Sequence, residues 1–225
     1  IFKLEDPKTE LKKKLMVTFE NEPAVDAGGV QREFFELIVN ELVSKEKKLF
    51  VTVGDFYWFN KDATDPKSLQ YYKLAGIIIG MGIYNGNLIN IRFPTIVYKR
   101  LKKMNVDFKD LNDYDSEIYN SLQSILKYEG DVSDFCLYFE YGGVPLVEGG
   151  SDKPVTNGNR EEYVEAVSKY ILCSSVELQF NKFREGVTQC VGKNKMKLFK
   201  PEELALLVAG REYLDFYALM KLYNS

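Results

Sequence analysis

The spacing of apolar and polar residues along this chain predicts a mainly helical α+β protein. Amphipathic or strongly apolar stretches predict helices over about residues 68–85, 116–127 and 159–172. Further helices are predicted after the turn at Gly28-Gly29, from Pro94 to Leu101, from Ser174 to about Val187, and from Pro201 up to Gly210. In the helix after the Gly-Gly turn, the expected buried residues are Phe34, Phe35, Leu37, Ile38 and Leu42.

Shorter runs rich in β-branched and aromatic residues predict strands. These runs are residues 15–19, 49–53, 56–60, 135–140 and 144–147. Gly54 and Asp55 separate the second run from the third, which predicts a hairpin. Pro145 cannot donate a ladder hydrogen bond, so the last run is expected at a sheet edge.

Three glycines lie on the helix predicted over residues 68–85. Gly76, Gly80 and Gly82 are spaced for close approach of a second helix, which outweighs the cost of glycine in a helix interior. Gly80-Met81-Gly82 is not a nucleotide-binding loop, because no strand precedes it and no third glycine follows. At other helix ends, Ser174 and Glu177 form a capping-box pattern, and Ser68 is a candidate cap.

Composition excludes several classes of chemistry. The 225 residues are 45% hydrophobic and 28% charged, with a net charge of −3, which suits a globular protein and gives no electrostatic case for nucleic acid. There is no histidine, so histidine-based catalysis and metal ligation are excluded. Three cysteines without a Cys-x-x-Cys motif indicate neither a disulfide framework nor a zinc site, and no metal or other cofactor is expected.

The absence of a disulfide pattern is typical of a reduced compartment, so we expect a cytoplasmic protein, with the nucleus also possible. The apolar run 74–84 is too short to span a membrane, and no membrane partner is expected.

A series of short motifs gives the chain a family resemblance. The motifs, in chain order, are Asp26-x-Gly28-Gly29-Val30-x-x-Glu33-Phe34-Phe35, Trp58-Phe59-Asn60, the helix Gly76 to Asn85, Arg92-Phe93-Pro94, Asp110-Leu111, Tyr119-x-Ser121-Leu122, Pro154-Val155-Thr156, Asn159 to Val164, Gln179-Phe180-x-x-Phe183-x-x-Gly186 and Phe199-x-Pro201-Glu202-Glu203-Leu204. In content and order they resemble the N-terminal lobe of the HECT domain of ubiquitin-protein ligases.

The resemblance implies an organisation and a function. It implies a large helical subdomain from residues 1–112 and 171–210, a smaller α/β subdomain from residues 113–170, and a hinge and the start of a C-terminal lobe in residues 211–225. The hinge lies near Gly210, Arg211 and Glu212. A full ligase of this family accepts ubiquitin as a thioester from a ubiquitin-conjugating enzyme and transfers it to substrate lysines. Its catalytic cysteine is expected beyond this chain, because none of the three cysteines matches its context. This piece alone is therefore expected to be inactive, and substrates are expected to bind through regions outside it.

The resemblance also places the groove that binds the conjugating enzyme. The matching residues are Ile118, Ser121, Leu122, Ile125, Tyr128, Phe135, Leu137, Tyr163 and Val167. The residue pattern agrees in part: Ile118, Leu122 and Ile125 form one helical stripe, and Phe135 and Leu137 would share one strand face. On pattern alone the same residues also fit an ordinary core. The resemblance favours the groove for Leu122, Tyr128 and Tyr163.

Two alternatives remain open from the sequence. One is a HECT-like scaffold that binds proteins without catalysis, because the deciding cysteine is not in this chain. The other is a helical small-molecule enzyme that uses carboxylates such as Asp26, Glu33 or Asp110. Turns and helix caps explain the same acids equally well.

Overall fold

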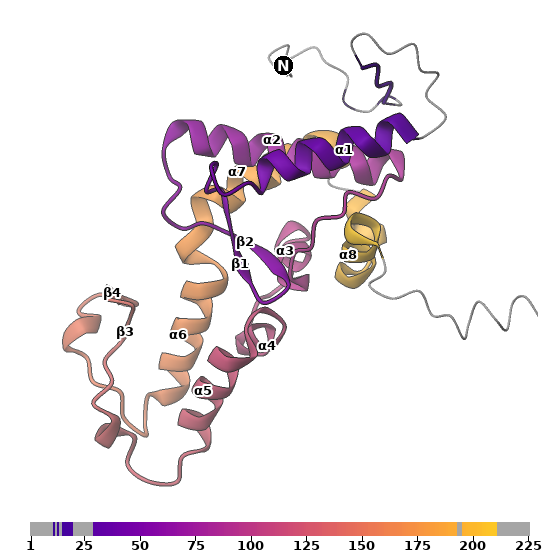
Figure 1. Cartoon of the computed structure of the whole chain (residues 1–225). Helices are drawn as coiled ribbons and strands as arrows, with labels where there is room; N and C mark the ends of the chain where they lie inside the picture. The colour runs from indigo at the N-terminus through magenta and orange to yellow at the C-terminus, as the bar shows by residue number, and fades with distance from the viewer. Residues whose placement is uncertain (1–10, 12, 14, 20–28, 193–194, 211–225) are drawn as a thin grey trace, which may run out of the picture.

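A computed structural model describes residues 11, 13, 15–19, 29–192 and 195–210, and these residues form a mainly helical α+β fold (Figure 1). The α-helices are α1 (Gly29–Leu42), α2 (Pro66–Asn85), α3 (Thr95–Leu101), α4 (Leu111–Tyr114), α5 (Ser116–Lys127), α6 (Arg160–Leu172), α7 (Glu177–Val191) and α8 (Pro201–Ala209). Short 3₁₀ turns cover Phe108–Asp110, Val132–Phe135, Gly150–Asp152, Ser174–Val176 and Lys195–Leu198. The strands are β1 (Phe50–Val53), β2 (Phe56–Phe59), β3 (Glu140–Tyr141) and β4 (Val144–Pro145). The predicted fold class is confirmed.

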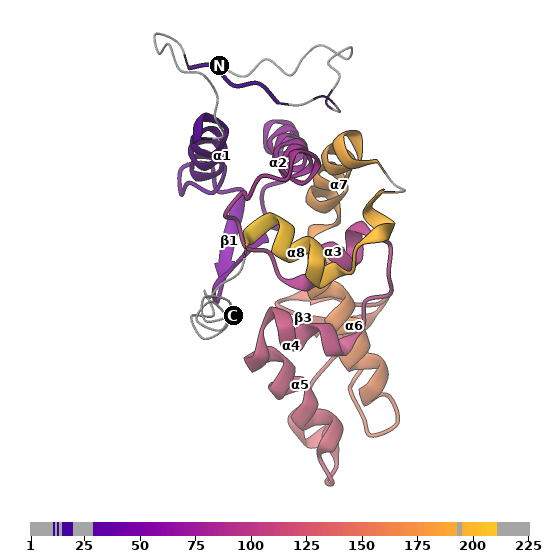
Figure 2. The same cartoon turned by 90° about the vertical axis from the view of Figure 1, so that its right-hand side faces the viewer.

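Helices α2 and α7 pack side by side at the centre of the helical part, as Figures 1 and 2 show. A methyl group at Gly76 would overlap the carbonyl oxygen of Phe183, and one at Gly186 would overlap that of Lys73. A methyl group at Gly80 would lie 2.8 Å from the Cβ atom of Cys190. The predicted close helix approach is therefore confirmed at Gly76 and Gly80.

Gly82 has a different neighbour from the one predicted. A methyl group there would meet the side chain of Ile89, which lies in the loop after α2 and not on a second helix. Cys190 lies beyond the predicted helix end near Val187, yet α7 continues past it to Val191. It is fully buried within α7, where its Sγ atom donates a hydrogen bond of 3.4 Å to the carbonyl of Ile77.

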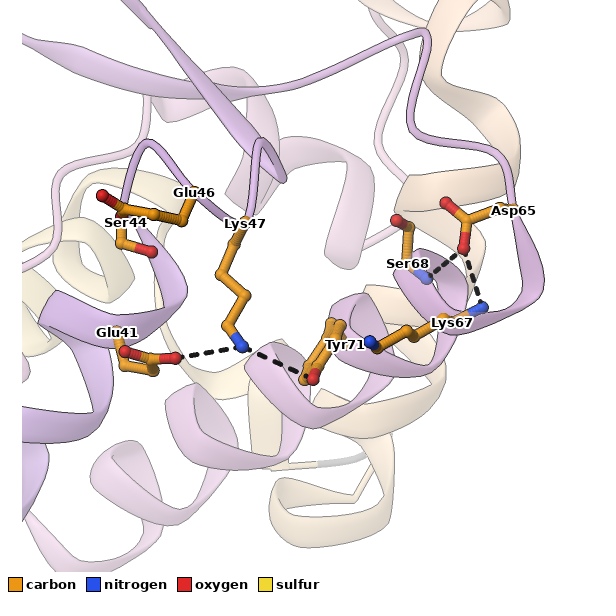
Figure 3. Close-up of a pocket in the computed structure, with 8 residues that line it drawn as sticks. All are labelled: Glu41, Ser44, Glu46, Lys47, Asp65, Lys67, Ser68 and Tyr71. Carbon is orange, nitrogen blue, oxygen red and sulfur yellow. Dashed lines mark hydrogen bonds and ion pairs between the residues drawn. The ribbon is translucent and has the colours of Figure 1, made fainter.

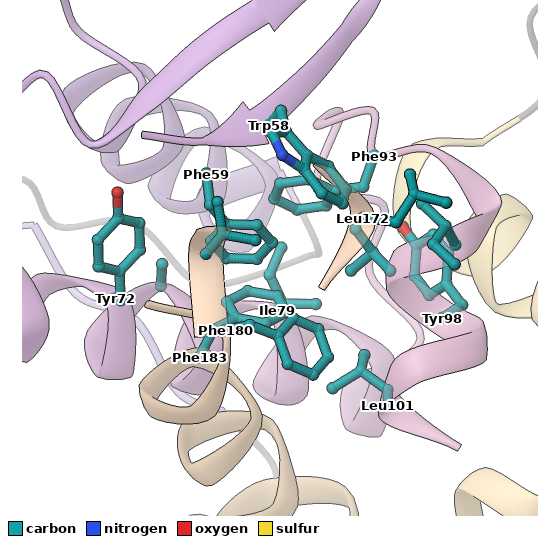
Figure 4. Packing of buried hydrophobic residues seen from close by; sticks show 14 of the residues in the cluster. Trp58, Phe59, Tyr72, Ile79, Phe93, Tyr98, Leu101, Leu172, Phe180 and Phe183 are labelled. Atoms are coloured by element: carbon teal, nitrogen blue, oxygen red, sulfur yellow. The ribbon is translucent and has the colours of Figure 1, made fainter. Parts of the chain in front are cut away.

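An aromatic cluster joins the first hairpin to this helix pair (Figure 4). Strands β1 and β2 pair in the predicted antiparallel hairpin, with Phe50 opposite Phe59. The ring of Phe59 lies 5.4 Å from that of Phe183 in an edge-to-face contact, and stacks at 6.1 Å on Phe93. Such pairs add to the free energy gained from burial alone. Tyr72 fixes the hairpin to α2, because its hydroxyl donates to the carbonyl of Leu49.

Several helix ends lie where the sequence places them. Helix α5 covers residues 116–127 as predicted, and α8 begins at Pro201 and ends before Gly210, whose φ is 78°. Helix α2 begins earlier than predicted, because the carboxylate of Asp65, and not Ser68, accepts from the backbone amides of the first turn. The Ser174–Glu177 capping box is wrong. Ser174 lies in a 3₁₀ turn, and its hydroxyl donates to the carbonyl of Lys169 at 3.4 Å.

Two strand predictions are wrong. Residues 15–19 have irregular structure, with the amide of Leu15 donating to the side chain of Asn85. Residues 132–135 form a 3₁₀ turn, because the carboxylate of Asp131 accepts from the amide of Ser133 and caps it. Cys136 then adopts a φ of 50°, which interrupts an extended chain. Phe135 and Leu137 therefore do not share a strand face. The pair β3 and β4 is shorter than predicted, and Pro145 lies at its edge as expected.

The buried face of α1 is rotated from the predicted one. Phe35 and Leu42 are buried as expected, together with Gln31 and Val39. Phe34 and Ile38 are half-buried. Leu37 is exposed, which corrects its predicted burial.

Figures 1 and 2 place α5, α6, β3 and β4 at one end of the molecule and α1, α2 and α7 at the other. The 3₁₀ turn Ser174–Val176 connects α6 to α7 between the two ends. The division at residues 113–170 stays a prediction.

Candidate docking surface

Helix α5 begins at a strong local signal. The carboxylate of Asp115 accepts hydrogen bonds from the amides of Glu117, at 3.0 Å, and Ile118, at 3.1 Å. Such a cap satisfies amides that have no partner within the helix. The sequence interpretation missed Asp115, although an aspartate immediately before Ser116-Glu117 is a recognisable helix start. The cap fixes the position of the whole apolar stripe on α5.

The end of α5 is tied to the start of α6. The guanidinium of Arg160 donates to the carbonyl of Tyr128 at 2.7 Å and to that of Ile125 at 3.4 Å. A cation is favourable there, because carbonyls at a helix C-terminus carry partial negative charge. Arg160 belongs to one of the sequence motifs, but no local pattern assigns it this role.

Hydrogen bonds order the long connection between α5 and α6, although it contains little β structure. Asn157 accepts from the amide of Val132 at 3.0 Å and donates to the carbonyl of Gly130 at 3.2 Å. Farther along, the amide of Phe139 donates to the carbonyl of Lys153, and backbone groups of Val155 and Leu137 are bonded at 2.8 Å. The connection therefore forms a defined surface.

Three of the predicted site residues are buried. Leu122 and Tyr163 are each 6% exposed, and Val167 has no exposed surface. The ring of Tyr163 packs edge-to-face on Phe139 at 5.5 Å. Burial raises the pKa of the Tyr163 phenol, with smaller contributions from Tyr141 and Glu140. In this structure, these three residues belong to the buried hydrophobic core.

Other predicted residues reach solvent. Tyr128 is 38% exposed and Phe135 is 42% exposed, and their ring centroids are 4.6 Å apart. We call these two residues the tip pair. Ser121 is also exposed, whereas Ile125 and Leu137 are half-buried. Tyr138, which the sequence interpretation did not include, is 43% exposed.

Ile118 lies at a separate cavity. The cavity has a volume of about 330 Å³ and is lined by Ile118 together with Trp58, Tyr114, Tyr141 and Tyr170. Burial raises the pKa of the Tyr114 phenol to about 12. The nine predicted residues thus differ in exposure: some are buried, some half-buried and some exposed. Among the exposed ones, Tyr128 and Phe135 are in contact with each other.

The remaining predicted residues can be placed only in part. Gly210 follows α8, and its amide donates to the carbonyl of Leu206 at 2.9 Å. Arg211 and Glu212 of the predicted hinge lie outside the described residues, as does Asp26.

The carboxylates of the enzyme alternative do not form a site among the described residues. Glu33 is exposed on α1, and Asp110 pairs with the amine of Lys99 at 2.6 Å. Within the described ranges, no three acidic or cysteine side chains gather to hold a metal ion. None of the described helices combines the length and apolar character needed to cross a membrane.

A polar pocket of about 500 Å³ lies between the end of α1 and the start of α2 (Figure 3). The amine of Lys47 pairs with Glu41 at 3.0 Å and donates to the hydroxyl of Tyr71 at 3.5 Å. The hydrogen bond to Glu41 is the main reason that the pKa of Lys47 is raised. Because residues from separate segments form this pocket, no local motif predicts it.

Comparison with known proteins decides the family. The profile of the HECT-domain (ubiquitin-transferase) family matches residues 36–224 of the chain. The chain belongs to the HECT family. The "Probable E3 ubiquitin-protein ligase mug30" of Schizosaccharomyces pombe is 33% identical over 97% of this HECT chain and 28% of its own length. "Probable E3 ubiquitin-protein ligase HERC4" of Homo sapiens is 35% identical over 94% of the chain and 21% of its own length.

A third relative, "Probable E3 ubiquitin-protein ligase HECTD2" of Mus musculus, is 33% identical over 95% of the HECT chain and 31% of its own length. The chain thus spans less than a third of each of these relatives. The resemblance inferred from the motifs is confirmed at the level of the family.

Proposed function

We propose that this chain is the part of a HECT ubiquitin ligase that docks a ubiquitin-conjugating enzyme, and that the tip pair is the centre of the docking surface. The observation that carries the proposal is the exposed contact between Tyr128 and Phe135 on a hydrogen-bonded frame. Exposed aromatic side chains that are already held in place lose little conformational entropy when a partner binds. Both residues also lie at positions that the family resemblance assigns to the groove.

The full protein would transfer ubiquitin in two steps. A ligase cysteine thiolate attacks the thioester on the conjugating enzyme, forms a new thioester and releases the enzyme's thiolate. A substrate lysine amine then attacks, forms an amide bond and releases the ligase cysteine. Dividing one acyl transfer into two steps is the general advantage of covalent catalysis. Docking aligns the two sulfur atoms for the first step.

The three cysteines of this chain are poor candidates for the acceptor. Cys190 is buried, and burial raises the pKa of the half-buried Cys173, which disfavours its thiolate. Cys136 is exposed, but the sequence around it does not match the context of the family's catalytic cysteine. We therefore place the catalytic cysteine outside this chain.

The docking surface suits a transient complex. The conjugating enzyme must leave after each transfer to be recharged. Interfaces below about 1,200 Å² are common in such encounters. We expect a Kd in the micromolar range, which corresponds to a binding free energy of about −8 kcal/mol.

The test is a calorimetric titration of the chain with uncharged conjugating enzyme. Tyr128→Ala and Phe135→Ala should each weaken binding by more than about 1 kcal/mol, or about fivefold, because each removes half of the tip pair. Leu178→Ala is the matched control, because Leu178 is 58% exposed and lies on α7. It should bind as the unmodified chain does. Equal affinity in all three variants would show that the surface lies elsewhere.

Tyr163→Ala is a second probe with a different expected signature. Because Tyr163 is buried, its replacement should lower both affinity and Tm, whereas the tip-pair variants should leave Tm unchanged.

A separate experiment distinguishes the ligase from the scaffold alternative, by testing whether the parent protein forms a thioester with ubiquitin. A parent protein that docks the enzyme and forms no reducible ubiquitin adduct would be a scaffold.

A further inference from the structure

Another concave surface borders the aromatic cluster, because Phe180 of that cluster lines it. It is a cavity of about 400 Å³, lined by the end of α3, the end of α6 and the first half of α7. Four of its side chains are cationic, namely Arg100, Lys103, Lys169 and Arg184, and one, Glu177, is a carboxylate. We call it the basic cavity.

Arg100 forms the floor of the basic cavity. Its guanidinium donates to the carboxylate of Glu177 at 2.6 Å and to the carbonyl of Leu172 at 3.0 Å. The group stacks on the ring of Phe180 at 3.8 Å, and the guanidinium of Arg184 lies 5.9 Å from the same ring. Arg100 is thus held by several partners, and it pairs with Glu177, the only carboxylate among the described residues that line the cavity.

The other cations lack a compensating charge. Lys103 and Lys169 are exposed and form no ion pair within the described part of the chain, and Arg184 donates only to the neutral amide of Asn181. The four cations against one carboxylate leave an excess of three positive charges. The whole chain, by contrast, has a net charge of −3. Gathering like charges in a hollow costs free energy unless an anion offsets it.

The backbone at Lys103 decides which replacement tests its ammonium group best. Its φ is 60°, a conformation that costs free energy for a residue with a side chain and that glycine adopts readily at helix ends. Glycine would therefore suit the backbone better at this position. Replacing Lys103 by glycine therefore removes the ammonium group without a cost to the backbone.

We propose that the basic cavity binds a small phosphate-bearing anion, with the phosphoryl group between Lys103, Lys169 and Arg184. A phosphate dianion matches the excess charge better than a carboxylate, and a guanidinium presents paired N–H donors that fit phosphate oxygens. The volume exceeds that needed by inorganic phosphate alone and lies in the range of small-molecule sites. Met104 and Val106 also line the cavity and can contact an organic group attached to the phosphate.

The experiment compares phenyl phosphate, inorganic phosphate and benzoate by calorimetry on the whole chain at a fixed ionic strength set with sodium chloride. Saturable binding of either phosphate, about tenfold tighter than benzoate, supports the proposal. Tighter binding of phenyl phosphate assigns a phosphate ester as the ligand class, and tighter binding of inorganic phosphate assigns the free ion. No saturable heat from either phosphate, or equal binding of benzoate, overturns the proposal.

Variants test whether the binding is at the basic cavity. Lys103→Gly and Lys169→Gln should each weaken phosphate binding about tenfold. Lys103→Gly should not lower Tm, because glycine accepts the positive φ. Lys67→Gln is the control, because Lys67 lines the polar pocket of Figure 3, where Glu41, Glu46 and Asp65 offset its charge. Unchanged binding in both cavity variants, or equal weakening in the control, would overturn the assignment.

Discussion

Arg160, at the start of α6, donates a 2.7 Å hydrogen bond to the carbonyl of Tyr128, the residue that caps the C-terminus of α5. This bond links the exposed tip pair to the packed helices. It therefore couples the geometry of the proposed docking surface to a residue that need not touch the partner. The coupling leads to the first prediction.

Arg160→Ala should weaken docking by about fivefold, because it leaves the Tyr128 carbonyl without its charged donor and loosens the tip pair. The free energy of unfolding should fall by about 1 kcal/mol. Titration and urea denaturation of the same protein measure the two effects. Arg160→Lys keeps the charge but loses the paired N–H donors of the guanidinium. Its affinity and stability should therefore lie between those of the unmodified chain and of Arg160→Ala. Unchanged affinity in Arg160→Ala would show that Tyr128 is positioned without Arg160.

Gly76→Ala should destabilise the chain by more than about 3 kcal/mol, since the new methyl group would overlap the Phe183 carbonyl and force α2 and α7 apart. Gly158→Ala is the matched control, because its nearest neighbour, the hydroxyl of Thr156, would be 3.8 Å away. Thermal denaturation should show a large fall in Tm for the first variant and little change for the second. Similar Tm values would mean that the helix pair tolerates separation.

Two buried tyrosines should respond in opposite directions to loss of the hydroxyl. The hydroxyl of Tyr98 is buried with no hydrogen-bond partner among the described residues, and burial raises the pKa of this phenol. Tyr98→Phe should therefore stabilise the chain by about 1 kcal/mol. The hydroxyl of Tyr72 donates to Leu49, so Tyr72→Phe should destabilise it by about 1 kcal/mol. Urea denaturation distinguishes the signs, and a loss of stability in Tyr98→Phe would reveal a partner for that hydroxyl.

The ion pair between Lys73 and Glu185 should make stability depend on acid pH. The hydrogen bond from Lys73, at 2.6 Å, lowers the pKa of Glu185 from its ordinary value of 4.5. A lowered folded-state pKa contributes stability above the unfolded pKa, and this contribution is lost as pH falls through the folded one. The effect should stay below about 1 kcal/mol, because both side chains are partly exposed. Glu185→Gln should remove this part of the decline below pH 4.5; an identical pH profile would show that the pair contributes nothing.

The sequence predicts those elements that local chemistry specifies. Helix α5 begins and ends where predicted, and Gly76 predicts a close helix pair, because capping residues and missing side chains act over a few residues. The connection after α5 was predicted as a strand from its aromatic content. Backbone amides instead donate to the side chains of Asp131 and Asn157, which folds this segment into turns, and Asn157 lies 25 residues from its donor Val132.

The sequence names the residues of the candidate site, whose place stays a prediction, and does not sort them into exposed and buried ones. Tyr128 and Tyr163 are the same residue type at positions that the resemblance treats alike, yet one reaches solvent and the other packs on Phe139. A helical stripe has the same pattern whether a core or a partner covers it. Only the packing of α5 against α6 and the connection separates the two cases.

The depth of Cys190 has a practical consequence for experiments on this chain. Its thiol lies in the seam between α2 and α7, whereas Cys136 is exposed. An alkylating reagent should therefore modify Cys136 in the folded protein and reach Cys190 only when the two helices part. In a Cys173→Ala background, the rate at which Cys190 is alkylated therefore measures how often α2 and α7 separate.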